Sequence, residues 1–348
     1  MVPAGGPYYM ISRNLGPELG GAVGILFYLG TTVAASMYIL GAAEIFMLYI
    51  YPKSKIFDDT FMCYRLYGTL ILIMLSCIVV SGVKVVNKFA LPTVFIVNLC
   101  ILLSFGGVFV KISGSSKINY CMVGDRLANL KNYLDNHEGD RVACNITELT
   151  RVYCHNASFS SLNCDSHFYL MAVQNRIEKR PAIRGLRSSV IFENIDPKYA
   201  DQHHLIVEYN ESVTPPSMKE SERIKKLYVF ADVTSSFIIL VGVFFPSVTG
   251  IMAGSNRSGN LKDASQSIPR GTIAATTISS VVYLAGAVLF GATLDGLFMR
   301  DKFGESAFGK LVIAELAVPH YMAVCVGSLV ATMGAGMQSL TGQLWVEI

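Results

Sequence analysis

The feature that most constrains this fold is a set of long apolar stretches without charge. Six windows between consecutive charged residues hold 18 to 31 uncharged residues each: Glu18 to Glu44, Arg65 to Lys84, Lys88 to Lys111, Asp232 to Arg257, Arg270 to Asp295 and Glu315 to Glu347. A membrane-spanning helix needs about 20 mostly apolar residues. The windows therefore predict an all-α membrane protein with six spans.

The charged residues are concentrated in one part of the chain. Only 15% of the residues are charged, against about 25% in soluble domains. Residues 113–228 hold 29 of the 53 charged residues. We therefore expect three spans in 1–112, a large hydrophilic insert at 113–228, three further spans in 229–342 and a short tail at 343–348. The net charge of +3 is too small to indicate a nucleic-acid partner, and the lipid bilayer is the partner that this composition favours.

The short turns between spans predict the orientation. The turn at 84–88 contains Lys84 and Lys88 and no acid, and the turn at 254–270 contains three basic residues and one acid. Short loops rich in Lys and Arg face the cytoplasm. These two turns are therefore expected inside, which places the insert at 113–228 outside.

Cysteines and glycosylation sequons in the insert indicate the same side. The insert contains four cysteines, namely Cys121, Cys144, Cys154 and Cys164, and three sequons that begin at Asn145, Asn156 and Asn210. An even number of cysteines in a polar segment suits disulfides in an oxidising compartment. We expect a disulfide-bonded, glycosylated extracellular loop. A zinc site there is the weaker interpretation, because no Cys-x-x-Cys or His-x-x-x-His spacing supports it.

The chain contains none of the common short motifs of enzymes. It has no Gly-x-Ser-x-Gly, no phosphate-binding glycine loop and no His-Glu-x-x-His. The sequence therefore predicts no enzyme and no cofactor. The pair Gly334 and Gly336 is too close to form a dinucleotide-binding fingerprint and is typical of close helix packing.

The most informative segment is 244–254, where Pro246, Gly250 and Gly254 fall inside one apolar window. Proline removes a backbone donor and glycine weakens a helix, so a bend or a full break is expected. In a broken helix the first half ends in carbonyl groups that attract a cation, and the second half begins with amide groups that attract an anion. Such discontinuous helices form the substrate sites of secondary transporters. A proline kink without any site is the alternative.

Tyr38 lies inside the first apolar window. A phenol within the membrane needs a polar partner, and its oxygen can serve as a cation ligand or cap a backbone group. A packing role is the alternative from the sequence alone.

Several motifs together resemble a known family. Phe245-Pro-Ser-Val-Thr-Gly-Ile-Met-Ala-Gly-Ser-Asn-Arg-Ser-Gly resembles the cation–chloride cotransporters, and Val2-Pro-Ala-Gly-Gly and Met37-Tyr-Ile-Leu-Gly-Ala resemble their potassium–chloride branch. The resemblance covers most of residues 2–342 and is weakest in the insert. It places the six spans at helices three to eight of the family.

The resemblance implies a fold and a set of ion ligands. The implied fold is part of the inverted-repeat fold of amino acid–polyamine–cation transporters, with a broken helix at the fourth span of this chain. Potassium, the only metal ion implied, is expected at Tyr38, Pro246 and Thr249. Chloride is expected at the backbone amides of Gly250, Ile251 and Met252. The implied disulfides join Cys121 to Cys144 and Cys154 to Cys164.

The function that the resemblance implies is electroneutral potassium–chloride symport across the plasma membrane, which controls cell volume and chloride, by a full-length homodimer. The family's first helix has no counterpart here, and the chain departs from the family after Gly342. We therefore expect a truncated chain that does not transport alone. The alternatives are a non-transporting partner or regulatory short form, and an amino-acid permease of the same fold.

Overall fold

The computed structural model describes residues 6–57, 59–130, 144–155, 158–196, 202–208, 226–231, 236–248, 250–251, 254–255, 261, 263–301, 304–306 and 312–344. The chain forms two compact units. Unit 1 comprises Met1–Ser104, Val248–Leu284 and Pro319–Ile348, and unit 2 comprises Phe105–Ser247 and Ala285–Val318.

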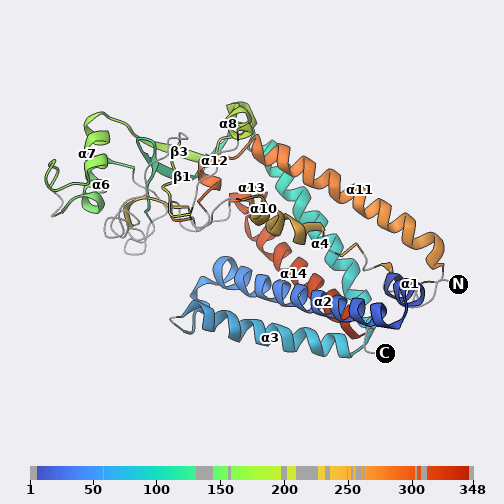
Figure 1. Ribbon diagram of the computed structural model, residues 1–348. Coiled ribbons are helices and arrows are strands. Elements are labelled where there is room, and N and C mark those ends of the chain that lie inside the picture. Colours follow the sequence, from blue (N-terminus) through green and yellow to red (C-terminus); the bar gives the residue numbers. More distant parts are fainter. Residues whose placement is uncertain are drawn as a thin grey trace. The chain divides into compact units, whose positions relative to one another are not determined.

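Within the described residues, five helices are long and apolar enough to cross a membrane (Figure 1). They are α2 (Pro17–Ile45) with its π-helical continuation η1 (Phe46–Ile50), α3 (Thr60–Val80), α4 (Val83–Val110), α11 (Ala264–Gly291) and α14 (Met322–Leu344). Each coincides with one of the predicted windows. The remaining window, Asp232 to Arg257, contains α10 (Phe237–Phe244), whose eight residues are too few to span the bilayer as one helix.

Unit 1 is a helical bundle in which α2 packs against α14, α3 and the short α1 (Gly6–Leu15). Its buried apolar core consists of Ile39, Leu75, Val79, Val86 and Met337. Small residues on α14 permit this packing, as the sequence predicts. A Cβ atom on Gly334 would lie 2.7 Å from Cγ2 of Thr93, and one on Gly336 would lie 3.4 Å from Cδ1 of Leu75. A short 3₁₀ turn, η2 (Pro52–Ser54), follows η1.

Unit 2 contains a small antiparallel sheet built from the insert. Its strands are β1 (Ser115–Val123), β2 (Arg126–Leu127) and β3 (Ile177–Ile183), in the order β2-β1-β3. The register pairs Tyr120 with Arg180 and Cys121 with Lys179. The described part of the insert also contains the helices α6 (Ile146–Tyr153), α7 (Ser166–Val173) and α8 (Val190–Ile195) and the 3₁₀ turn η4 (Leu186–Ser188).

Both disulfides that the resemblance implies are present: Cys121–Cys144 and Cys154–Cys164. Two backbone hydrogen bonds flank the second disulfide: His155 donates to the carbonyl of Asn163, and Asp165 donates to that of Tyr153. Beside it the rings of Tyr153 and Phe168 stack with centroids 4.7 Å apart. Buried aromatic rings and disulfides together form one core of the insert.

A second core in unit 2 joins the insert to the segment after α11. Leu294, Leu297 and Phe298 pack with residues of β1 and β3, and Val312 and Leu316 belong to the same cluster. The segment forms two short helices, α12 (Gly296–Met299) and α13 (Val312–Leu316). The apolar windows leave 295–315 as a connection between two spans, whereas its described residues Leu297, Phe298 and Val312 pack in the core of the insert. We call the insert and this segment together the outer domain, because the predicted orientation places the insert outside. This contact requires the C-terminal end of α11 and the insert to share one side of the membrane, as the predicted orientation also requires.

Candidate functional site

The candidate site is built on α10 and the backbone that follows it. Ser236 caps the helix, because its hydroxyl oxygen accepts a hydrogen bond from the amide of Ile239 at 3.4 Å. All eight residues of α10 are apolar or glycine, Phe-Ile-Ile-Leu-Val-Gly-Val-Phe. The cap therefore agrees with the observed start of the helix.

The α-helix ends at Phe244 and continues as a 3₁₀ turn, η5 (Phe245–Val248). Pro246 has no backbone N–H to donate to the carbonyl four residues earlier, so the α-helical ladder is interrupted at this residue. The hydroxyl of Ser247 donates to the carbonyl of Phe244 at 2.6 Å. One carbonyl at the end of the helix is thus satisfied by a side chain, in the way expected of serine near a break.

Gly250 adopts a backbone conformation that favours glycine, with φ of +93°. No heavy atom outside its neighbours lies within 4 Å of a Cβ built there, so the backbone angle and not crowding accounts for the glycine. Ile251 follows and is exposed. Thr249 and Met252, the other two candidate ligands in this segment, lie outside the described residues.

Tyr38 lies on α2 and is partly buried. Its Cβ atom lies 3.8 Å from a Cβ built on Gly336, so the tyrosine stands where α2 faces α14. Tyr38, Gly250 and Ile251 belong to unit 1, whereas Pro246 belongs to unit 2. The chain passes from one unit to the other between Ser247 and Val248, within η5.

One of the three expected glycosylation sites, Asn145, lies in the described part of the outer domain. Asn145 precedes α6 at its N-cap, and Asn145 and Thr147 of this sequon are both exposed. Asn156 and Asn210 lie outside the described residues. Four cysteines, Cys63, Cys77, Cys100 and Cys325, do not form disulfides. Within the described residues, no group of three or more His, Cys, Asp and Glu side chains could hold a metal ion.

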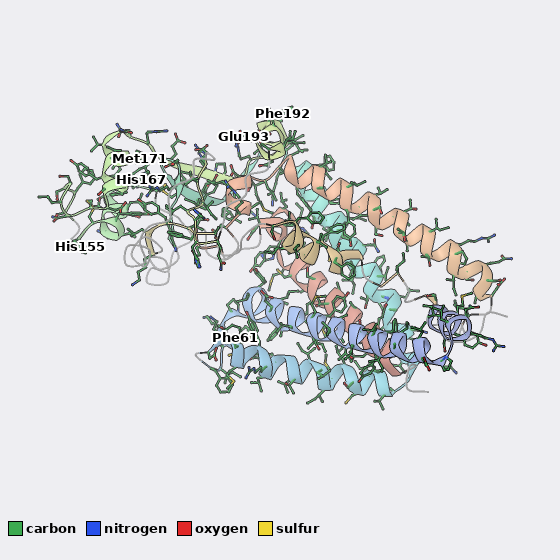
Figure 2. The ribbon with its side chains drawn as sticks, viewed as in Figure 1. Phe61, His155, His167, Met171, Phe192 and Glu193 are labelled. Carbon is green, nitrogen blue, oxygen red and sulfur yellow. A yellow bond between two sulfur atoms is a disulfide. The ribbon has the colours of Figure 1, made fainter. Side chains whose placement is uncertain are left out.

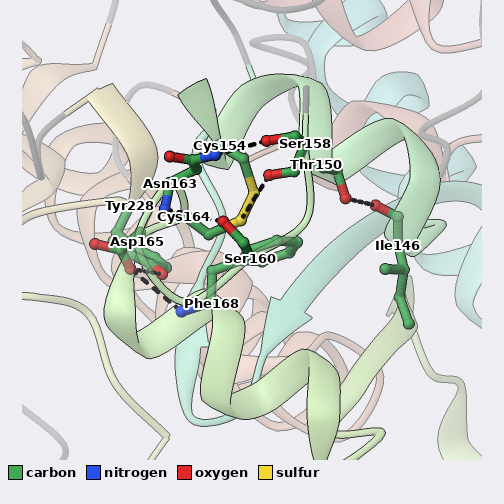
Figure 3. The surroundings of a disulfide bond; sticks show 10 residues. All are labelled: Ile146, Thr150, Cys154, Ser158, Ser160, Asn163, Cys164, Asp165, Phe168 and Tyr228. Atoms are coloured by element: carbon green, nitrogen blue, oxygen red, sulfur yellow. Dashed lines mark hydrogen bonds between the residues drawn. A yellow bond between two sulfur atoms is a disulfide. The ribbon is translucent and has the colours of Figure 1, made fainter. Parts of the chain in front are cut away.

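A buried polar cluster that the sequence did not reveal stabilises the outer domain (Figure 3). The hydroxyl of Tyr228 donates to Oδ2 of Asp165 at 2.8 Å, and the same oxygen accepts from the amide of Phe168 at 3.2 Å. Burial raises the pKa of Tyr228, as do the neighbouring Tyr153 and Asp165. The phenol therefore stays neutral and acts as a hydrogen-bond donor. No local motif marks Tyr228 as the partner of Asp165, because 63 residues separate them.

The outer domain also contains a pocket of about 340 Å³, lined in part by Arg180, Glu208, Phe290, Asp295 and Arg300. Both arginines of this lining are engaged with neighbouring residues. Arg180 pairs with Glu208 at 2.8 Å, and Nη2 of Arg300 donates to the carbonyl of Val207 at 2.9 Å. These contacts indicate a structural role, since they join both β3 and the segment after α11 to Val207 and Glu208.

The comparison with known families gives one match. A family model described as amino acid permease matches residues 1–146 and 208–342. The stretch between them, 147–207, contains α7, β3, α8 and all of α6 except its first residue. The match covers α2, α3, α4, α10 and α11 and extends to residue 342 in α14. The fold is therefore that of amino acid–polyamine–cation transporters, and the chain belongs to the amino acid permease family, a family of multi-pass membrane transporters.

Proposed function

We propose that the protein carrying this chain is an electroneutral potassium–chloride symporter of the plasma membrane. The observation that supports this best is the order of backbone groups around the interruption at Pro246. A helix ending in carbonyl groups comes first, and a glycine turn leading into amide groups follows. One short segment therefore offers adjacent binding sites for a cation and an anion.

The cation would bind at the end of α10. The carbonyl of Gly242 receives no hydrogen bond from Pro246, four residues later, because proline has no N–H. The negative end of the helix dipole lies at the same place. In this proposal the phenol oxygen of Tyr38, the carbonyl of Pro246 and the hydroxyl of Thr249 supply the other potassium ligands.

The anion would bind to the backbone that begins at Gly250. A positive φ such as that of Gly250 lets successive N–H groups point toward one side, which is how backbone nests bind anions. In this proposal the amides of Gly250, Ile251 and Met252 hold chloride. Movement of one potassium with one chloride carries no net charge, so the ion gradients alone supply the free energy. The work of such a protein is control of cell volume and intracellular chloride, and we propose that it acts as a homodimer.

The family match supports a second candidate, transport of an amino acid. A zwitterion presents the same pair of charges to the break. Its ammonium group would face the carbonyl end of α10, and its carboxylate would face the amides near Gly250. The two proposals differ in the substrate and agree on the segment.

Rubidium uptake by cells expressing the protein tests the first proposal, because rubidium replaces potassium. We expect uptake that requires external chloride and does not change when the membrane potential is clamped at different values. Uptake that persists after chloride is replaced by gluconate would refute chloride coupling. Uptake of labelled amino acids without chloride-dependent rubidium flux would favour the second candidate.

Two glycine variants test the role of the break. Gly250→Ala forces alanine into a positive φ, which costs about 1–2 kcal/mol and distorts the proposed anion turn. Gly254→Ala is the matched control, because Gly254 has no positive φ and a Cβ there would meet nothing within 4 Å. We expect reduced flux in the first variant and near-normal flux in the second at equal surface expression. Equal flux in both would contradict the proposed role of Gly250.

A further inference from the structure

The segment around α8 lies on the outer ends of two membrane-spanning helices. The side-chain amide of Asn194 donates to the carbonyls of Gly291 and Leu294, at 2.7 and 2.9 Å. Gly291 is the last residue of α11. Since the final carbonyls of a helix have no partner within it, Asn194 caps the outer end of this span.

The same segment is also fixed to the outer end of α4, which ends at Val110. The amide of Arg187 donates to the carbonyl of Ile112 at 3.2 Å. Gly185 makes this approach possible: its φ is +81°, and a Cβ there would collide with the backbone of Ile112 and Gly114. Residues 185–194 are therefore held at the level where two spans leave the bilayer.

At this level α8 exposes apolar side chains. Val190 is fully buried and Asn194 is engaged with α11, and these residues lie four apart on one face of the helix. Phe192 and Ile195 lie three apart on the other face and are 72% and 66% exposed. Figure 2 shows Phe192 on α8, beside the C-terminal end of α11.

The charges around α8 are compatible with a lipid headgroup region. Glu193 pairs with Arg184 at 2.5 Å, so its charge is compensated. Arg187 is exposed and available to phosphate groups, and Asp196 is the acid that follows the helix. Aromatic and aliphatic side chains next to basic residues are typical of helices that lie in the membrane interface.

We propose that α8 anchors the outer domain at the membrane interface, with Phe192 and Ile195 buried in the outer leaflet of the phospholipid bilayer. Lipid is the favoured occupant because both contacts of the segment are the ends of membrane spans. The exposed apolar surface of α11 at Val288, one turn before its end, continues toward the same level. This anchor would hold the outer domain at a fixed height above the membrane.

Depth-dependent fluorescence quenching tests this proposal in the full chain. The chain has one tryptophan, Trp345, so Trp345→Phe provides a silent background. Phe192→Trp and, separately, Ile195→Trp are then introduced, and the protein is reconstituted in phosphatidylcholine with bromines at shallow or deep acyl positions. Leu162→Trp is the control, because Leu162 is 95% exposed on the disulfide loop of the outer domain.

We expect shallow bromines to quench the Phe192→Trp variant severalfold more than the control variant, and deep bromines to quench it less. The Ile195→Trp variant gives an independent reading if the first variant does not fold. Red-shifted, unquenched emission from both variants would place α8 in water. Blue-shifted, unquenched emission would mean that protein, from another segment or a second copy, covers the face. Either result overturns the proposal.

Discussion

The hydrogen bond between Tyr228 and Asp165 gives a prediction that can be worked out from the structure. Tyr228→Phe keeps the buried ring, its edge contact with His167 and its place beneath Arg126. It removes only the hydroxyl that donates to Asp165 at 2.8 Å. A hydrogen bond to a charged group contributes about 1.5–3 kcal/mol. Asp165 keeps its bond from the amide of Phe168, so we expect the lower half of that range, about 1.5–2 kcal/mol.

For a folded unit of 150–250 residues, each kcal/mol changes the melting temperature by about 2–4 °C, so Tyr228→Phe should melt about 3–8 °C lower. The assay is thermal unfolding of the purified full chain in detergent, followed by loss of the monodisperse peak. The control is Tyr169→Phe, because the hydroxyl of Tyr169 makes no hydrogen bond within the described residues. An unchanged melting temperature in Tyr228→Phe, or an equal decrease in the control, would refute the reasoning.

Three further predictions concern the outer domain. Replacing Cys154 and Cys164 together by serine opens a short loop and should cost about 2–3 kcal/mol, seen as retention inside the cell and reduced surface labelling. Burial and then Arg126 lower the pKa of His167, so the unfolded chain takes up this proton first as pH falls. Stability should be complete above about pH 6.5 and decrease below it, and His167→Gln should flatten that dependence in melting curves. Asn145→Gln should lower the apparent mass on gels by that of one glycan, and treatment with a glycosidase should abolish the difference from wild type.

Much of the membrane region could be predicted because its signal is local. Absence of charge over about 20 residues is sufficient to indicate a span, and α2, α3, α4, α11 and α14 all lie within or beside such windows. The interruption at Pro246 is local as well, because the missing N–H belongs to one residue. The disulfide pairs came from the resemblance, since four cysteines allow three pairings by sequence alone.

The outer domain was less predictable because its contacts are not local. Leu294 and Phe298 join the sheet of the insert across more than 100 residues of sequence, and no periodic pattern in so short a segment indicates this. Tyr120 belongs to the same core and stacks on Phe298 with ring centroids 5.6 Å apart. Sequence patterns detect elements, whereas the pairing of short elements depends on tertiary packing.

Chloride dependence of rubidium uptake tests the central proposal most directly. The measurement compares cells expressing the protein with untransfected cells, in chloride and in gluconate, at two clamped membrane potentials. The account predicts additional uptake that disappears in gluconate and is the same at both potentials. Additional uptake that survives in gluconate, or that follows the membrane potential, would contradict it.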